Sequence, residues 1–178
     1  MNGNCHFGFG AVCGSMLALN LDKIGNVLPD LNNAQEMAVL FVIGGLLGGI
    51  FPDIDNPESY MGKLTAPVSV WIGKIGELTG KTGKFHRGIL HDPIVYLIGL
   101  YLSYCYYPAL CGFFTGCLSH LFLDLFNPSG IPFLFGIKHL HLGKIRSGSK
   151  ESIIFTWIMS AVILIAGMLA KAQIFSKK

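Results

Sequence analysis

The chain has 178 residues, of which 52% are hydrophobic and only 13% are charged. Soluble domains carry about 25% charged residues, and the apolar residues here form long blocks, so the sequence predicts an integral membrane protein. The net charge is only +3 and no Lys/Arg-rich run is present. This argues against direct nucleic-acid binding, which needs a basic patch or stripe.

Five apolar blocks predict an all-α, multi-pass membrane helix bundle with about five transmembrane helices, forming one integral membrane domain over residues 1–178. The long apolar stretch after Pro93 is too long for one span. We divide it at Tyr107, because aromatic residues favour the membrane interface and the following proline begins a helix well. The expected spans are Cys5–Leu21, Met37–Phe51, Pro93–Tyr107, Pro108–Phe126 and Ser152–Ala170.

Shorter apolar segments lie between these spans. Pro67–Leu78 is interrupted by Lys74 and Glu77, and we expect an interfacial amphipathic helix there. Phe133–Leu142 is predicted to be re-entrant or interfacial, with His139 and His141 as interfacial side chains. Glycines four residues apart predict close helix packing at three places, Gly44 with Gly48, Gly45 with Gly49, and Gly112 with Gly116.

Polar residues cluster where the apolar blocks begin or end. In chain order they are His6, Asp53, Asp55, His86, Arg87, His91, Asp92, His120 and Asp124. His120 and Asp124 are four residues apart and therefore share one helical face. Two carboxylates two residues apart, as in Asp53 and Asp55, would point to the same side of an extended backbone. Each group also has a simpler interpretation, namely an interfacial histidine, a solvated acidic loop, or a His–Asp hydrogen bond.

The positive charges predict an orientation. With five spans, the N-terminus and the segments 53–92 and 127–151 lie on the same side of the membrane. That side carries the basic residues Lys63, Lys74, Lys81, Lys84, Arg87, Lys138, Lys144, Arg146 and Lys150, and the other carries Lys23, Lys171, Lys177 and Lys178. The positive-inside rule therefore predicts a cytoplasmic N-terminus, with the polar clusters at the cytoplasmic face.

The chemistry of the clustered residues favours a metal site. Imidazole and carboxylate ligands together suit zinc, and also manganese or iron, better than magnesium. The seven candidate ligands are too many for one tetrahedral ion and predict two ions: His6, Asp53, Asp55, His86, His91, His120 and Asp124. Two such ions would activate water and clamp a displaced phosphoryl group. Arg87 is a candidate for holding a phosphate oxygen, or alternatively pairs with Asp92 or a lipid headgroup.

These motifs, in this order and spacing, resemble the YdjM-like family, described as LexA-binding, inner-membrane-associated, metal-dependent hydrolases. The residues that carry the resemblance are His6, Phe51-Pro52-Asp53-Ile54-Asp55 with Pro57, His86-Arg87-Gly88 with His91, and Gly116 through Ser119-His120 to Asp124, followed by Pro128, Gly130 and Pro132. The family usually has Thr-His-Ser where this chain has Leu90-His91-Asp92. The resemblance implies a metal hydrolase of the bacterial inner membrane, and Arg87 and Asp92 are our candidate catalytic residues.

The resulting hypothesis is hydrolysis of a phosphoester in a phospholipid or another lipid-linked phosphate, because the site is expected at a membrane face near basic residues. A non-catalytic, metal-stabilised scaffold or regulatory protein is the alternative. A metal transporter is a third interpretation, which would need polar groups deep across the membrane rather than at one face.

Overall fold

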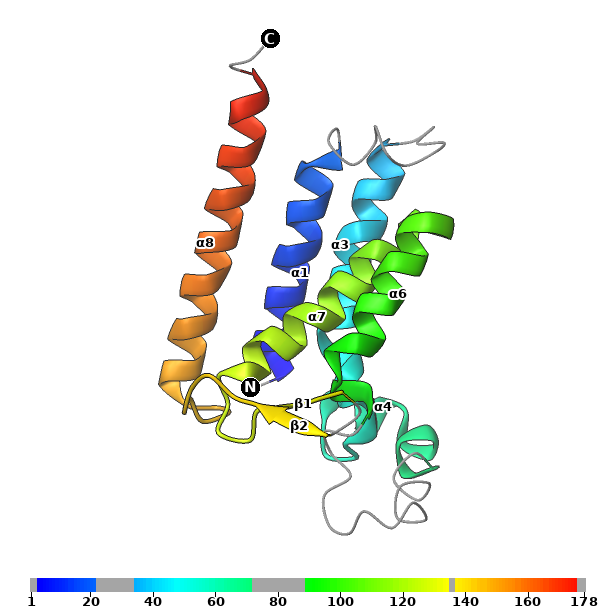
Figure 1. Cartoon of the computed structure of the whole chain (residues 1–178), viewed down its shortest axis with the longest axis vertical. Helices are drawn as coiled ribbons and strands as arrows, with labels where there is room; N and C mark the ends of the chain where they lie inside the picture. Colours follow the sequence, from blue (N-terminus) through cyan, green and yellow to red (C-terminus); the bar gives the residue numbers. More distant parts are fainter. Residues whose placement is uncertain (1–2, 22–33, 72–88, 135–136, 176–178) are drawn as a thin grey trace.

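The computed structural model describes residues 3–21, 34–71, 89–134 and 137–175. Five long helices run along the molecule: α1 (Gly3–Leu19), α3 (Ala34–Ile50), α6 (Pro93–Tyr106), α7 (Cys111–Leu125) and α8 (Lys150–Phe175) (Figure 1). The helix α1 begins at one end of the bundle and α8 ends at the other, so the chain traverses the bundle five times. The predicted all-α, multi-pass membrane fold is confirmed.

The five helices are not equally suited to crossing a membrane alone. Three segments are long and apolar enough, Ala34–Asp55, Pro108–Leu125 and Lys150–Ala172. The helix α6 has 14 residues, which corresponds to about 21 Å at the α-helical rise, against roughly 30 Å of hydrocarbon. The sequence predicted five spans; α1, with 17 residues, and α6 are not among these three segments.

The short elements explain how the helices end. Pro52 lies in the 3-10 helix η1 (Phe51–Asp55) directly after α3, and Ser59 caps α4 (Tyr60–Leu64) by accepting a hydrogen bond from the amide of Gly62. The 3-10 helix η2 (Ile89–His91) precedes α6, and η3 (Pro108–Leu110) joins α6 to α7. Because Pro52 favours a helical backbone, Asp53 and Asp55 lie on a 3-10 turn, and the expectation of extended backbone there is wrong.

Two segments expected at the interface are partly described. The backbone of residues 66–71 is helical, and the remainder of the predicted Pro67–Leu78 helix lies outside the described residues. The segment expected to be re-entrant or interfacial contains strand β2 (Lys138–Leu140), which pairs antiparallel with β1 (Ile131–Phe133) in the register Ile131↔Leu140. The pattern of apolar residues in the sequence did not predict these strands.

Glycines hold α1, α3 and α7 together. A Cβ atom built on Gly10 or Gly116 would collide with the carbonyl oxygen of Gly45, and one on Gly48 would collide with the carbonyl oxygen of Phe113. The three backbones therefore touch directly, as small residues permit in lipid-embedded helices. The predicted glycine pairs do lie at these contacts. This close approach brings the first residues of α1, the end of α3 and the end of α7 to one place.

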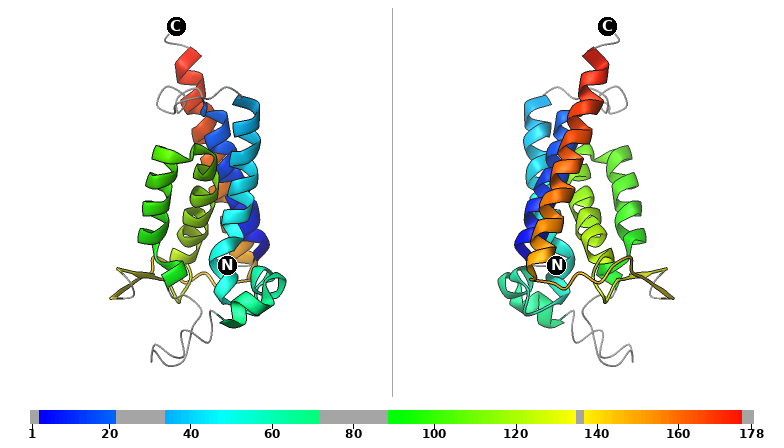
Figure 2. Two further views of the ribbon diagram at one scale, coloured as in Figure 1. Left: turned by 90° about the vertical axis from the view of Figure 1, so that its right-hand side faces the viewer. Right: turned by 90° about the vertical axis from the view of Figure 1, so that its left-hand side faces the viewer.

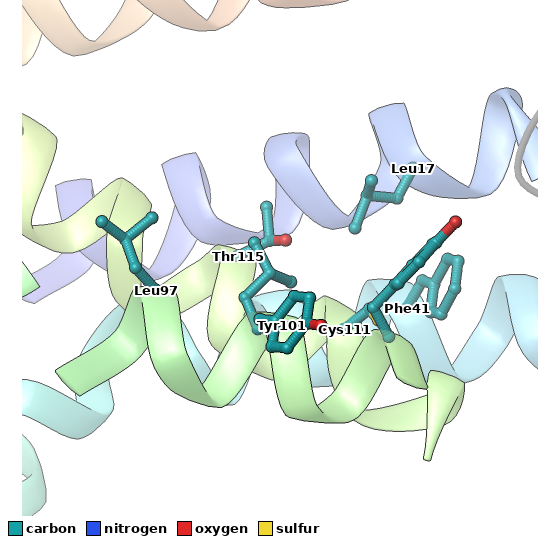
Figure 3. A pocket seen from close by; sticks show the side chains of 8 residues that line it. Leu17, Phe41, Leu97, Tyr101, Cys111 and Thr115 are labelled. Carbon is teal, nitrogen blue, oxygen red and sulfur yellow. The ribbon is translucent and has the colours of Figure 1, made fainter. Parts of the chain in front are cut away.

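An apolar cavity of about 360 Å³ lies between α1, α3, α6 and α7 (Figure 3). Its walls include Leu17, Phe41, Leu97 and Tyr101, and none of the polar cluster residues in the described part of the chain lines it. Leu17 lies eleven positions after His6 on α1, or about 16 Å along the helix axis. The cavity therefore lies in the apolar part of the bundle, away from the polar clusters.

Candidate metal centre

The structure gathers six of the seven predicted metal ligands at one end of the bundle, the end at which α1 and α8 begin. We call this the ligand end (Figure 2). Four elements supply them, α1, η1, η2 and α7. The six residues are His6, Asp53, Asp55, His91, His120 and Asp124. Five of these side chains are buried, and Asp53 is partly exposed at 19%.

The first ligand group consists of His6, His120 and Asp124, whose ligand atoms all lie within 4.8 Å of one another. Asp124 Oδ1 is 3.5 Å from His6 Nε2, and Asp124 Oδ2 is 3.8 Å from His120 Nε2. The rings of His6 and His120 stack with their centroids 3.7 Å apart. The group thus joins the start of α1 to the end of α7.

The second ligand group consists of Asp53, His91 and His120. Asp53 Oδ1 lies 3.5 Å from Nε2 of both His91 and His120. Asp55 approaches the other side of the His91 ring, with Oδ2 3.6 Å from Nδ1. His120 therefore belongs to both groups, and Asp55 lies beside the second group.

These spacings fit metal coordination. Two atoms bound to one tetrahedral zinc ion at about 2.1 Å lie roughly 3.4 Å from each other, close to the separations of 3.5 to 3.8 Å found here. A direct hydrogen bond between a ring nitrogen and a carboxylate would instead be about 2.7–2.9 Å long. The groups are therefore too far apart for good hydrogen bonds and suitably placed around a cation.

The protonation of His120 supports this interpretation. Its Nδ1 lies 2.8 Å from the carbonyl oxygen of Gly49, and because a carbonyl only accepts, Nδ1 carries the hydrogen. A neutral ring then has a lone pair on Nε2, directed at the carboxylate oxygens of Asp53 and Asp124. Nε2 of His120 is buried and makes no hydrogen bond with any described residue. This ring nitrogen and the carboxylate oxygens that it faces are all hydrogen-bond acceptors, so a cation is needed between them. Imidazole nitrogen and carboxylate oxygen are ligands that fit a divalent metal ion.

The charge around His91 also favours a cation. Burial alone would lower the pKa of the His91 imidazole, but the carboxylates of Asp53 and Asp55 beside its two ring nitrogens raise this pKa to about 9. Asp53 and Asp55 are thus placed to stabilise positive charge between them. In a buried site this stabilisation applies to a metal ion as it does to a proton.

One residue missed by the sequence reasoning positions a candidate ligand. Asn127 is buried and donates through Nδ2 to Asp124 Oδ1 at 3.3 Å and to Ser147 Oγ at 2.9 Å. It lies three residues after Asp124, in the turn that follows α7, and this short separation was the available signal. Such outer hydrogen bonds orient metal-binding carboxylates.

Other candidates lie elsewhere. His86 and Arg87 fall outside the described residues. Asp92 is buried and caps α6 by accepting a hydrogen bond of 3.0 Å from the amide of Ile94, which accounts for its burial at a helix start. It belongs to neither ligand group. His139 and His141 are exposed, on and beside β2.

Comparison with known proteins agrees with the motifs. The family model described as YdjM inner membrane protein matches residues 1–175. The chain belongs to the YdjM inner membrane protein family. The resemblance inferred from the sequence is thereby confirmed, and YdjM membership together with the apolar helices shows a bacterial inner-membrane protein.

Two curated YdjM relatives illustrate the similarity. The chain is 32% identical over 103 residues to the inner membrane protein YdjM of Escherichia coli K12, and equally similar to that of Shigella flexneri. Each match covers 53% of this chain and 48% of the relative, so the chain spans about half the length of the curated relatives it matches. No solved structure matches the chain.

Proposed function

We propose that this YdjM family member is a membrane-embedded, metal-dependent hydrolase that cleaves a phosphoester of a phospholipid or lipid-linked substrate. The observation that carries the proposal is the pair of ligand groups sharing His120. Mixed imidazole and carboxylate ligands favour zinc, with manganese or iron as other candidates. Divalent ions bound at such a pair lower the pKa of water towards about 7 and polarise a phosphoryl oxygen.

The protein's own residues have separate tasks in this proposal. His120 has one free lone pair, on Nε2, and would bind one ion, completing either the group with His6 and Asp124 or the group with Asp53 and His91. The remaining carboxylate and imidazole ligands would hold a second ion beside it. The Gly49 carbonyl keeps His120 in the tautomer whose Nε2 is free to bind an ion. Asp53 is the one member of either group that is partly exposed, so we infer that substrate approaches from its side.

The position of the site supports a lipid substrate. The ligands lie where α1 and α8 begin and where α3 and α7 end, at the level where lipid phosphates meet the hydrocarbon region. The cavity between α1, α3, α6 and α7 has an almost wholly apolar lining, of the kind that suits a hydrocarbon chain. A soluble phosphoester would need no such apolar surroundings.

A metal-stabilised scaffold is the second candidate function. It is favoured by the burial of His6, His91, His120 and Asp124, each at most 2% exposed, because metal bound there would tie together the three elements that carry them, α1, η2 and α7. Metal transport is less well supported, because both ligand groups found in the described part of the chain lie at one end.

Arg87→Lys separates enzyme from scaffold. The lysine keeps the charge but loses the planar, bidentate fork that suits a phosphate. If Arg87 meets charge developing on the substrate, the variant should keep its metal and thermal stability but lose about 100-fold or more in turnover. The measurements are metal content, thermal unfolding and a screen of phospholipid and phosphoester hydrolysis on purified protein.

The matched control is Arg146→Lys, the same replacement at an exposed site, which should leave turnover unchanged. An active wild-type protein with an equally active Arg87→Lys variant would remove the assigned role of Arg87. A metal-loaded wild-type protein that is inactive on phospholipids and lipid-linked phosphates would favour the scaffold.

We also propose that the ligand end faces the cytoplasm. The five traverses place the first and last residues of the bundle at opposite ends, and nine of the 13 basic residues belong to the segments on the N-terminal side. Reporter fusions after Lys178 and near Lys81 should therefore report opposite sides, with the fusion near Lys81 in the cytoplasm. If both fusions reported the same side, the proposed topology would be wrong.

A further inference from the structure

The β1–β2 hairpin lies across the ligand end of the bundle. The two strands run crosswise to the long helices and project sideways past α6 (Figures 1 and 2). Backbone bonds tie the following segment to the end of α7, from Leu142 to Leu125 at 2.7 Å and from Ile145 to Phe126 at 2.9 Å. The hairpin is therefore held at the height where the apolar helices end, parallel to the plane of a membrane around them.

Exposed apolar and basic side chains alternate along the outer strand and the segment that follows it. Ile137, Leu140 and Leu142 are 78%, 40% and 69% exposed. We define the basic hairpin surface by these three residues with the exposed side chains between and after them, Lys138, His139, His141, Lys144 and Arg146. Exposed apolar residues of this size are unfavourable in water and favourable against a lipid interface.

The cations of this surface have no acidic partners among the residues that the structure describes. Lys138, Lys144 and Arg146 form no ion pair with any residue in the described ranges. Between Asn127 and Glu151 the sequence contains no Asp or Glu. The surface therefore carries uncompensated positive charge and would be complementary to an anionic ligand.

We propose that the basic hairpin surface binds the anionic headgroups of membrane phospholipids. Long basic side chains reach headgroup phosphates while neighbouring apolar residues enter the acyl boundary, and this surface offers both in alternation. A nucleic acid or an acidic protein would match the charge but leave Ile137 and Leu142 exposed. Membrane lipid is the occupant that accounts for both features and for the height of the hairpin. The inference goes beyond the proposed function and holds whether or not metal is bound.

The test uses the full chain in nanodiscs of mixed phosphatidylglycerol and phosphatidylcholine, with native mass spectrometry to count the lipids that remain bound. Wild-type protein should retain phosphatidylglycerol selectively, and the selectivity should fall in higher salt. Each cation near an anionic surface strengthens binding by about fivefold. The variant Lys138→Gln/Lys144→Gln/Arg146→Gln should therefore lose about tenfold or more of this selectivity.

Two controls separate position from charge. Lys138→Arg/Lys144→Arg/Arg146→Lys keeps the charge at the same positions and should keep the selectivity, and Lys171→Gln at the far end of α8 should leave it unchanged. Equal selectivity in wild-type and the triple Gln variant would overturn the proposal, as would an equal loss in Lys171→Gln. If the triple variant fails to fold, wild-type selectivity that does not respond to salt would also overturn it.

Discussion

His120→Ala is expected to weaken metal binding at the ligand end more than any other single substitution. His120 Nε2 faces Asp53 of the second group at 3.5 Å and Asp124 of the first group at 3.8 Å, so an ion bound to this nitrogen can be completed by ligands of either group. Loss of a residue that only orients a ligand costs about 10- to 100-fold in metal affinity. Loss of a residue that binds the ion directly should therefore cost at least about 100-fold, with any hydrolytic activity lost in parallel.

The measurement is metal content by mass spectrometry after dialysis against a weak chelator, together with a competition titration of metal affinity. His141→Ala is the matched control, because His141 is exposed and belongs to neither group, and it should bind metal as the wild-type protein does. His6→Ala and Asp53→Ala should each weaken one position more than the other. Full metal content in His120→Ala would show that the two groups do not form the proposed centre.

Gly45→Val should disrupt the bundle itself. A Cβ atom at Gly45 would meet the backbone of α1 at Gly10 and Gly14, and the same region of α3 receives Gly116 of α7. Backbone cannot move aside as a flexible side chain can, so the helices must separate. Overpacking typically costs 1–3 kcal/mol, and this contact between backbones places the expected cost at about 3 kcal/mol or more.

The consequence extends to the metal site, because His6 is carried by α1 and Asp124 by α7. Gly45→Val should lower both the thermal unfolding temperature in detergent and the metal content. Gly8→Val is the matched control. Gly8 lies in α1, the helix that Gly45 contacts, and an added Cβ there meets nothing within 4 Å. Similar unfolding temperatures for the two variants would contradict the assigned packing.

Hydropathy was sufficient to predict the five long helices. In lipid every backbone polar group must be bonded internally, so a long apolar block with few charges has helix as its available spanning structure. The break at Pro108 was predicted for the same local reason, a proline after two interfacial tyrosines, and α6 and α7 do meet there through η3. The glycine spacing likewise indicated close contacts before their partners were known.

The candidate ligands were also recognisable from the sequence. Ionisable side chains beside membrane-spanning helices are energetically unfavourable, and those that occur there usually have a function. The i, i+4 spacing of His120 and Asp124 directly predicted their shared helix face, and they do approach each other. The hairpin was not predicted, because three-residue strands have too little alternation to be detected. The burial of Asp92 became interpretable only once α6 was seen to begin beside it.

Sequence alone therefore determined the membrane fold and the set of polar residues, since both depend on local composition and spacing. Tertiary structure decided which of those polar residues lie close together in each ligand group. His6 and Asp124 are 118 positions apart in the sequence, and no local pattern indicates that they lie 3.5 Å from each other. The contact of α1, α3 and α7 through glycine places His120 between Asp53 and Asp124. That shared position depends on how three backbones pack, and packing is a property of the whole bundle rather than of any one segment.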